Sequence, residues 1–366
     1  MLPWLTAAGD PGRVHTEGRM ARAAVEQARE QVAALLGARP REVVFTSGGT
    51  EAIAAAVWGT TSRGSHHVVT AVEHSAVREA AARHPVTVVG VDGLGRVDPD
   101  EVVAAIRTGE TAAVHVQWAN HEVGTVQPVA EIADRCRSGD VLLHADAAAA
   151  AGHVPIDFAA SGVDLLSVSA HKLGGPQGVG ALLVRRGLRL PPLLVGGDQE
   201  RSRRAGTENV AGIVGFGAAA ALLAEGAGAR LAVEAEAARA LTDRALRAAL
   251  ALDRVEAYGD LAHRLPHLVC LGVGGVEAEA VLLGLDQAGV AAHSGSACSS
   301  ESLEPSPVLQ AMGVEAERSL RVSVGWSTTG DDVDAFCRAL PSVVERLRAL
   351  AAAHGAPTGE PSRRPC

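Results

Sequence analysis

The chain has 366 residues, of which 47% are hydrophobic and only 2% aromatic, so its core is expected to consist mainly of Ala, Val and Leu. This length is sufficient for a large core and favours two domains. The formal net charge is −9 and no run of Lys and Arg is present, which disfavours direct binding to a nucleic-acid backbone.

The first part of the chain alternates between helix-like and strand-like patterns. Residues 19–36 predict an amphipathic helix that ends at Gly37. Apolar runs rich in β-branched residues predict strands at 42–45, 66–72, 86–91, 112–117, 141–145, 164–170 and 180–184. Helical segments separate several of these runs. The alternation therefore predicts an α/β fold with a mostly parallel sheet that helices cover on both faces.

From about Glu208 the pattern becomes mainly helical, with a long Ala-, Leu-, Arg- and Glu-rich stretch at 229–252. Short strands are predicted near 254–258, 267–273 and 320–324. We place a boundary close to residue 226, which gives a large domain of residues 9–226 and a smaller α+β domain of residues 227–354. The composition of residues 355–366 predicts a disordered tail.

Five cysteines are widely spaced and form no Cys-x-x-Cys pair, which fits free thiols in a reducing cytoplasm. They are Cys136, Cys270, Cys298, Cys337 and Cys366. The first 15 residues lack the basic and then apolar layout of a signal peptide. The longest uncharged stretch, residues 209–224, is too short and too rich in Ala and Gly to span a membrane. We therefore expect a cytoplasmic protein without a membrane segment.

Two charged residues stand at the ends of neighbouring predicted strands. Lys172 precedes a glycine-rich loop in SAHKLGGPQGVGALL, a position that suits a surface lysine and a reactive one about equally. In a dry cleft, desolvation lowers the pKa of a lysine amine and frees it to bond a carbonyl carbon. Asp146 follows an apolar strand, where a carboxylate is costly without a partner. An aspartate can pair there with the pyridinium nitrogen of pyridoxal phosphate (PLP), and parallel sheets bind ligands at this edge.

Other polar groups suit an anion or a flat ring. The segment SGGTE, residues 47–51, opens a predicted helix and offers backbone N–H groups and a hydroxyl to a phosphate. Ser169 and His171 flank Lys172 and can reach the same anion. His74 follows the second strand, where a histidine is more often structural than catalytic. The 14 histidines include no zinc-type spacing, so we expect no metal.

Cys298 lies in the polar segment HSGSACSSESLEPS, residues 293–306, with Pro305 inside it and Pro307 directly after it. Free cysteine usually packs as a small hydrophobic residue, whereas this surrounding is polar. The position therefore favours a thiol that reacts or binds a metal.

Taken together, these segments resemble the cysteine desulfurases, PLP enzymes of the class V aminotransferase group with the fold type I architecture. The resemblance runs from about residue 9 to about residue 330, and the cysteine segment resembles the group I branch. The matching segments are FTSGGTE, EHSAV, NHEVGTVQP, HADAA, SAHKLGGPQGVGAL, RAGTENVAG and SGSACSSESLEPS.

The resemblance implies a cofactor site. Lys172 is expected to bind PLP covalently, and Asp146 to pair with its pyridinium nitrogen. The remaining cofactor-binding residues implied by the family are Gly49, Thr50, His74, His121, Ser169, His171 and Thr207. Thr207 is expected to reach the cofactor phosphate of a neighbouring subunit, which implies a homodimer.

The resemblance also implies the reaction. Arg321 is expected to hold the carboxylate of L-cysteine, which suits a bidentate guanidinium contact. His74 serves as an acid and base, and Cys298 is the nucleophile that takes the substrate's sulfur as a persulfide, leaving L-alanine. A sulfur-acceptor protein then receives the sulfur for iron–sulfur cluster assembly or tRNA thiolation.

Three features depart from the family pattern. Ala149 stands where the family has a glutamine that bonds the PLP phenolic oxygen, His121 replaces an asparagine, and residues 1–8 lack the family's usual first strand and loop. A selenocysteine lyase, another class V enzyme and a non-catalytic paralogue that serves as a binding scaffold therefore remain alternatives. The scaffold alternative is opposed by the joint presence of Lys172, Asp146, His74, Arg321 and Cys298.

Overall fold

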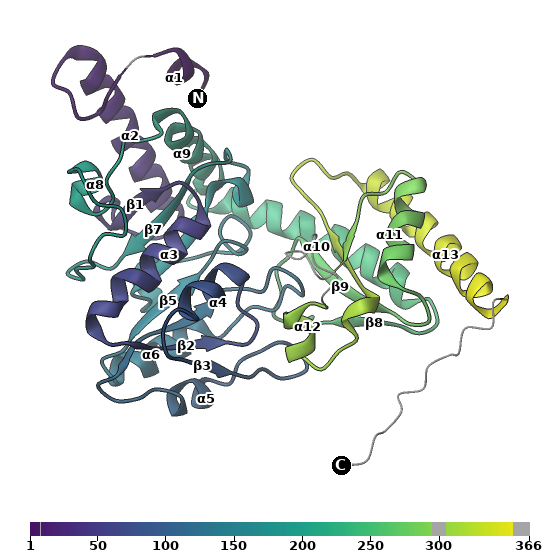
Figure 1. Ribbon diagram of the computed structural model, residues 1–366. Helices are drawn as coiled ribbons and strands as arrows, with labels where there is room; N and C mark the ends of the chain where they lie inside the picture. The colour runs from purple at the N-terminus through teal and green to yellow at the C-terminus, as the bar shows by residue number, and fades with distance from the viewer. Residues whose placement is uncertain (8, 295–304, 354–366) are drawn as a thin grey trace.

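The computed structural model describes residues 1–7, 9–294 and 305–353, which form two sheets flanked by helices (Figure 1). The strands of the larger sheet are β1 (Val43–Thr46), β2 (His66–Thr70), β3 (Val86–Val89), β4 (Thr111–Gln117), β5 (Leu142–Asp146), β6 (Leu165–Ser169) and β7 (Gly180–Val184). Those of the smaller sheet are β8 (Val255–Tyr258), β9 (Leu268–Val273), β10 (His293–Ser294) and β11 (Ser319–Ser323).

The helices lie around these sheets. They are α1 (Leu2–Thr6), α2 (Thr16–Leu35), α3 (Gly49–Thr60), α4 (Ser75–Ala81), α5 (Pro99–Ala104), α6 (Val129–Ser138), α7 (Phe158–Ser161), α8 (Gln199–Ser202), α9 (Val210–Ala224), α10 (Ala229–Leu250), α11 (Ala278–Gln287), α12 (Pro307–Ala311) and α13 (Gly330–Ala353). The long helix α10 runs from the larger sheet's helices to the smaller sheet (Figure 1).

The larger sheet has the order β1-β7-β6-β5-β4-β2-β3. Strands β3, β2, β4, β5 and β6 pair in parallel, whereas β7 pairs antiparallel with β6 and with β1. The predicted mostly parallel α/β sheet is thus confirmed. The sequence pattern missed the short elements α1 and β10, which are too brief to show a periodicity.

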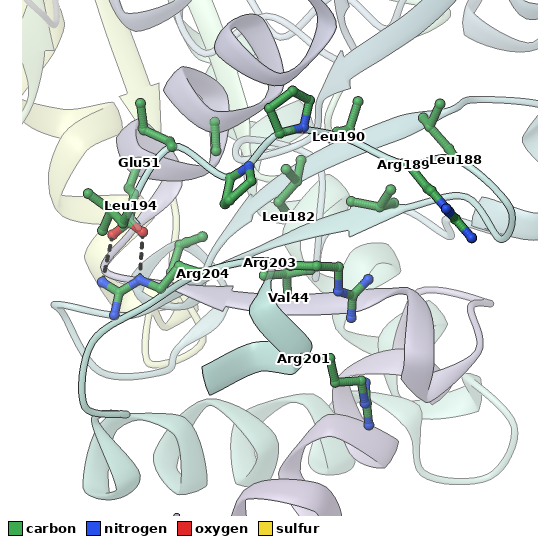
Figure 2. A pocket seen from close by; sticks show the side chains of 16 residues that line it. Val44, Glu51, Leu182, Leu188, Arg189, Leu190, Leu194, Arg201, Arg203 and Arg204 are labelled. Atoms are coloured by element: carbon green, nitrogen blue, oxygen red, sulfur yellow. Dashed lines mark hydrogen bonds and ion pairs between the residues drawn. The ribbon is translucent and has the colours of Figure 1, made fainter. Parts of the chain in front are cut away.

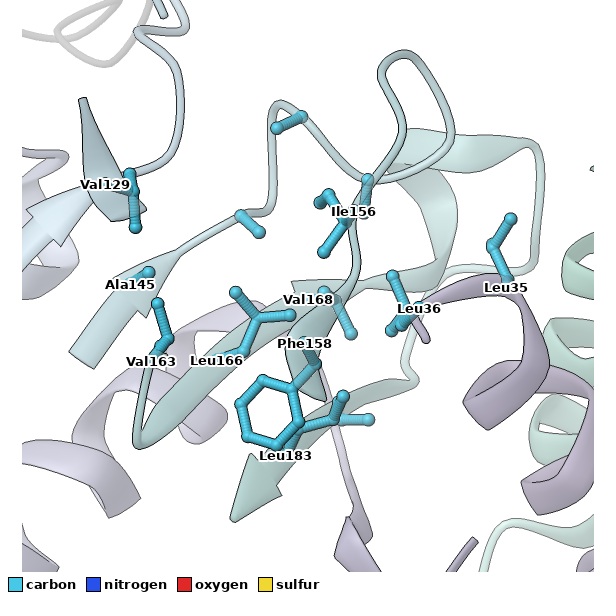
Figure 3. Packing of buried hydrophobic residues seen from close by; sticks show 14 of the residues in the cluster. Leu35, Leu36, Val129, Ala145, Ile156, Phe158, Val163, Leu166, Val168 and Leu183 are labelled. Atoms are coloured by element: carbon cyan, nitrogen blue, oxygen red, sulfur yellow. The ribbon is translucent and has the colours of Figure 1, made fainter. Parts of the chain in front are cut away.

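Hydrophobic clusters cover both faces of the larger sheet. On one face, α2, α6 and α9 pack on alternate strand residues such as Leu166 and Val168. Phe158 of α7 belongs to the same cluster (Figure 3). On the other face, α3 packs on Leu165 and Leu182. Two-sided cover explains why these strands are continuous apolar runs in the sequence.

The smaller sheet has the order β10-β11-β9-β8 and its own core against α10, α11 and α13. A third cluster joins the larger sheet to the segment around α12. In this cluster Val72 and Val123 pack with Val308 and Leu309 of α12 and with Met312 at its end. The predicted boundary near residue 226 falls between α9 and α10 and stays a prediction. The predicted tail, residues 355–366, lies outside the described residues.

No single helix in the described ranges is long and apolar enough to cross a membrane. Helices α9 and α10 pass that test only as a pair, on length and composition, and the pair is bent by 81°.

A buried ion pair fixes the segment that follows β7 onto the sheet. Arg29 of α2 donates two hydrogen bonds of 2.7 Å to the carboxylate of Glu200. Glu200 Oε2 also accepts from the backbone N–H of Phe45 in β1, and Arg29 donates to the carbonyl of Val43. One carboxylate therefore holds a helix, an edge strand and α8 together.

Replacing Glu200 by Ala leaves the Arg29 guanidinium buried without its carboxylate. We expect the free energy of unfolding to fall by about 3–5 kcal/mol. Glu26→Ala is the matched control, because its carboxylate contacts the same guanidinium at 3.2 Å but is 41% exposed; its loss should be about 0–1 kcal/mol. Denaturant unfolding at one protein concentration measures both, and equal losses would contradict the assignment.

A row of buried histidines crosses the face of the sheet under α3 and α4. His67 Nδ1 lies 2.9 Å from His115 Nε2, His115 Nδ1 lies 3.0 Å from His144 Nδ1, and His144 Nε2 lies 2.8 Å from Ser167 Oγ. Burial lowers the pKa of His67 to about 4 and that of His144 to about 3, and it also lowers the pKa of His115. The row is therefore neutral at pH 7.

Because the histidine row is neutral in the folded state, the free energy of unfolding should depend on pH. An unfolded histidine has a pKa of about 6.5, so the unfolded state binds more protons than the native state below that pH. The free energy of unfolding should fall as pH drops from about 6.5 toward 4. His115→Gln should make this slope shallower by up to about 1.4 kcal/mol per pH unit. His84→Gln, outside the hydrogen-bonded row, is the control, and an unchanged slope in His115→Gln would refute the interpretation.

Candidate active site

The carboxyl ends of β4, β5 and β6 form one edge of the larger sheet, and Asp146 is the last residue of β5. It pairs in register with Gln117 of β4 and Ser167 of β6. Its side chain is buried and Oδ1 accepts from the backbone N–H of Ala148 at 2.9 Å. Burial raises the pKa of Asp146, while that hydrogen bond and the charges of His74, His121 and Lys172 act in the opposite direction. These three predicted site residues therefore lie within electrostatic range of Asp146.

His74 and His121 lie side by side at this edge. His74 caps α4 by accepting the backbone N–H of Ala76 at Nδ1, at 3.0 Å. Its ring centroid lies 5.1 Å from that of His121, and the ring planes are at 65°. Arg321 of β11 donates to the backbone carbonyl of His121 at 3.1 Å. Arg321, the predicted substrate-binding arginine, thus extends from the smaller sheet to the carboxyl ends of the strands of the larger sheet.

The start of α3 provides an anion cradle next to β6. Gly48 occupies the N-cap position and no side chain caps the helix. The first backbone N–H groups of α3 therefore lack a capping acceptor, and the positive end of the helix dipole lies at the same place. A Cβ added to Gly49 would lie 3.3 Å from Ser169 Cβ, so the backbone approaches β6 closely there. Ser169 Oγ lies 2.9 Å from His171 Nδ1. Gly49, Ser169 and His171 therefore converge, and Thr50 is exposed beside them.

Lys172 lies in a 3-10 turn, Ala170–Leu173, directly after β6. Gly174 ends the turn with a φ of 84°, a conformation that favours glycine. The carbonyl of Lys172 lies 2.9 Å from His153 Nε2, and the His153 ring stacks on His267 at 3.6 Å between centroids. Of the two environments that the sequence left open for Lys172, the single chain shows the exposed one.

Thr207 is exposed on the segment between α8 and α9. Arg204 in this segment donates two hydrogen bonds to Glu51 of α3 (Figure 2). The pair borders a pocket of about 350 Å³ lined by apolar side chains of β1, β7 and residues 188–194 and by further arginines. None of the predicted site residues in the described ranges lines this pocket.

The predicted nucleophile Cys298 lies outside the described residues, as does Cys366. Of the other cysteines, Cys136, Cys270 and Cys337 are free. Among the described residues, no group of three or more His, Cys, Asp and Glu side chains could hold a metal ion.

Two glutamates at this edge were not predicted from the sequence. Glu73, directly before His74, is 1% exposed. Glu122, directly after His121, is also buried, and Ser306 at the start of α12 donates to its Oε2. The reasoning that singled out Asp146, a carboxylate placed just beyond an apolar strand, applies equally to Glu73 and could have found it.

The residues present fit PLP. Asp146 is buried at a strand end and suits the ring nitrogen, and the start of α3, which no side chain caps, approaches Ser169 closely and suits the phosphate. Lys172, on the turn after β6, suits the carbonyl carbon.

Comparisons with known proteins give the class. The family model of class-V aminotransferases matches residues 5–336. The NifS-like protein from Rickettsia africae has a TM-score of 0.85 at 28% identity, with 94% of each chain covered. The SspA structure in complex with cysteine has a TM-score of 0.76 at 29% identity over 88% of this chain and 92% of that one. The chain belongs to the class-V aminotransferase family.

Within that family, the chain is similar in sequence to proteins of one group, the cysteine desulfurases. A cysteine desulfurase of Trichormus azollae is 45% identical over 96% of this chain and 90% of its own length. The chain is therefore a member of the cysteine desulfurases, as its motifs indicated.

Gly49→Ala tests the anion cradle. The added Cβ would lie 3.3 Å from Ser169 Cβ and force the start of α3 and Ser169 apart, so we expect PLP to bind more weakly by about 1–3 kcal/mol. Gly90→Ala is the control, because a Cβ there meets nothing within 4 Å. Cofactor absorbance after stepwise dialysis measures the retention of PLP, and equal retention in the two variants would argue against the cradle.

Proposed function

We propose that the protein is a PLP-dependent cysteine desulfurase that converts L-cysteine to L-alanine and leaves the sulfur as a persulfide on Cys298. The observation that carries the proposal is the convergence of Asp146, His74, His121 and Lys172 at one strand edge, with Arg321 arriving from the smaller sheet. The neighbour SspA, whose structure contains cysteine, supports L-cysteine as the substrate.

The same geometry supports a division of cofactor contacts. Lys172 would bind PLP covalently, Asp146 would pair with its ring nitrogen, and His74 and His121 would contact the ring. Gly49, Thr50, Ser169 and His171 would hold the phosphate. When bound, PLP acts as an electron sink for the substrate's α-carbon.

The chain's own residues then position the reactants and move protons. Arg321 holds the substrate carboxylate through a charge-assisted contact. The Lys172 amine takes the α-proton, and His74 takes the proton of the Cys298 thiol, because a thiolate is the reactive form. The Cys298 sulfur bonds to the substrate sulfur as the carbon–sulfur bond breaks. Protonation of the remaining three-carbon skeleton gives L-alanine, so the atoms balance.

A second subunit is part of the proposal. Lys172 and Thr207 are both exposed in the single chain, which supports a homodimer in which Thr207 reaches the phosphate of the partner's cofactor and the partner covers Lys172. A sulfur-acceptor protein takes the persulfide sulfur for iron–sulfur cluster assembly or tRNA thiolation. The expected cytoplasmic location stays a prediction.

The purified protein with bound PLP should release equal amounts of alanine and sulfide from L-cysteine in the presence of a reductant. Lys172→Ala and Cys298→Ala should each abolish both products, because one supplies the amine and the other the sulfur-accepting thiol. Quantifying alanine and sulfide in the same samples checks this. Absence of product from PLP-loaded wild-type protein would favour the scaffold alternative.

Activity on selenocysteine distinguishes a selenocysteine lyase from a cysteine desulfurase. A selenocysteine lyase has no need of the thiol for sulfur capture, so Cys298→Ala would keep its activity on selenocysteine.

A further inference from the structure

Glu73 is a buried carboxyl group for which the proposed reaction has no use so far. It lies between β2 and His74 and is 1% exposed. Its Oε1 accepts from Thr70 Oγ1 at 2.6 Å and from the backbone N–H of Gln117 at 2.7 Å. Its Oε2 is buried and has no hydrogen-bond partner among the described residues.

These contacts place Glu73 at the catalytic edge. Gln117 is the last residue of β4 and stands opposite Asp146 in the parallel register. Glu73 therefore ties the turn that carries His74 to the strand directly beside Asp146. Its electrostatic surroundings include the carboxyl group of Asp146 and the imidazole of His121.

We propose that Glu73 is a positioning residue for the proposed reaction: it holds the turn that carries His74 against β4, beside Asp146, without adding a charge to the surroundings of Asp146. This inference rests on the proposed function, because Asp146 matters here as the partner of the cofactor ring.

The surroundings of the two acids favour the charge on Asp146 over the charge on Glu73, although burial raises the pKa of both groups. Burial raises the pKa of Glu73 to about 8, its hydrogen bonds from Thr70 and Gln117 act against this, and the charge of Asp146 raises it further. Asp146 has three favourable neighbours, His74, His121 and Lys172, whereas Glu73 has only His121. A second carboxylate here would compete for the same positive charges, so an uncharged Glu73 favours the ionised form of Asp146.

Glu73→Gln and Glu73→Ala separate the two parts of this role. Gln keeps an acceptor for Thr70 and Gln117 without a charge, so we expect it to retain most of the turnover. Ala removes the tie between His74 and β4, and misplacement of an acid–base group costs on the order of tenfold to a hundredfold in rate. Turnover of L-cysteine by the PLP-loaded variants measures this, and a Gln variant as slow as the Ala variant would overturn the proposal.

An infrared titration reads the carboxyl group without using activity. The wild-type holoenzyme should show a neutral-carboxyl band that disappears as pH rises through about 8. The band should be absent from Glu73→Gln and present in Glu122→Gln, which removes the other buried glutamate of this edge. A band that persists in Glu73→Gln, or no such band in the wild type, would overturn the proposal.

The two proposals fail in different ways. A wild-type protein that releases neither alanine nor sulfide contradicts the proposed function, whatever the infrared titration shows. An active wild-type protein without the alkaline carboxyl band contradicts only the role of Glu73.

Discussion

The parallel pairing of β4, β5 and β6 is the constraint on which the site depends. It brings the three strand ends to one edge, with Gln117, Asp146 and Ser167 in a row. Successive strand residues face opposite sides, so a shift of one residue would turn Asp146 toward the apolar cluster under α2 and α9. The hydrophobic pattern that secures the core thereby also fixes the direction of the site's carboxylate.

Polar groups gather on one face of this sheet. The histidine row lies on the same face as Asp146, because His144 and Asp146 are two residues apart on β5. Buried polar atoms are normally paired, yet His67 Nε2, Glu73 Oε2 and Gln117 Nε2 have no partner within the described part of the chain. These unpaired buried atoms lower the free energy of unfolding, and they lie on the face that holds the candidate site. The opposite face is packed with apolar side chains.

Much of this arrangement was predictable from local sequence. The β-branched runs defined the strands, and the positions of Asp146 and Lys172 at strand ends placed them at a common edge. The contact of Arg321 with His121 joins residues 200 positions apart, which no local pattern reveals. The sequence left the exposure of Lys172 open, because burial depends on everything packed around a residue, including any second subunit.

The hydrogen bond from Ser306 to Glu122 joins α12 to the loop after β4, beside a cluster in which Val72 packs on Val308. This bond constrains recombination between relatives. A chimera that takes its first 226 residues from one parent and the rest from another unites Glu122 and Ser306 of different origin. Parents that both carry this donor and acceptor preserve the junction, so compatibility depends on a few interface positions more than on overall identity.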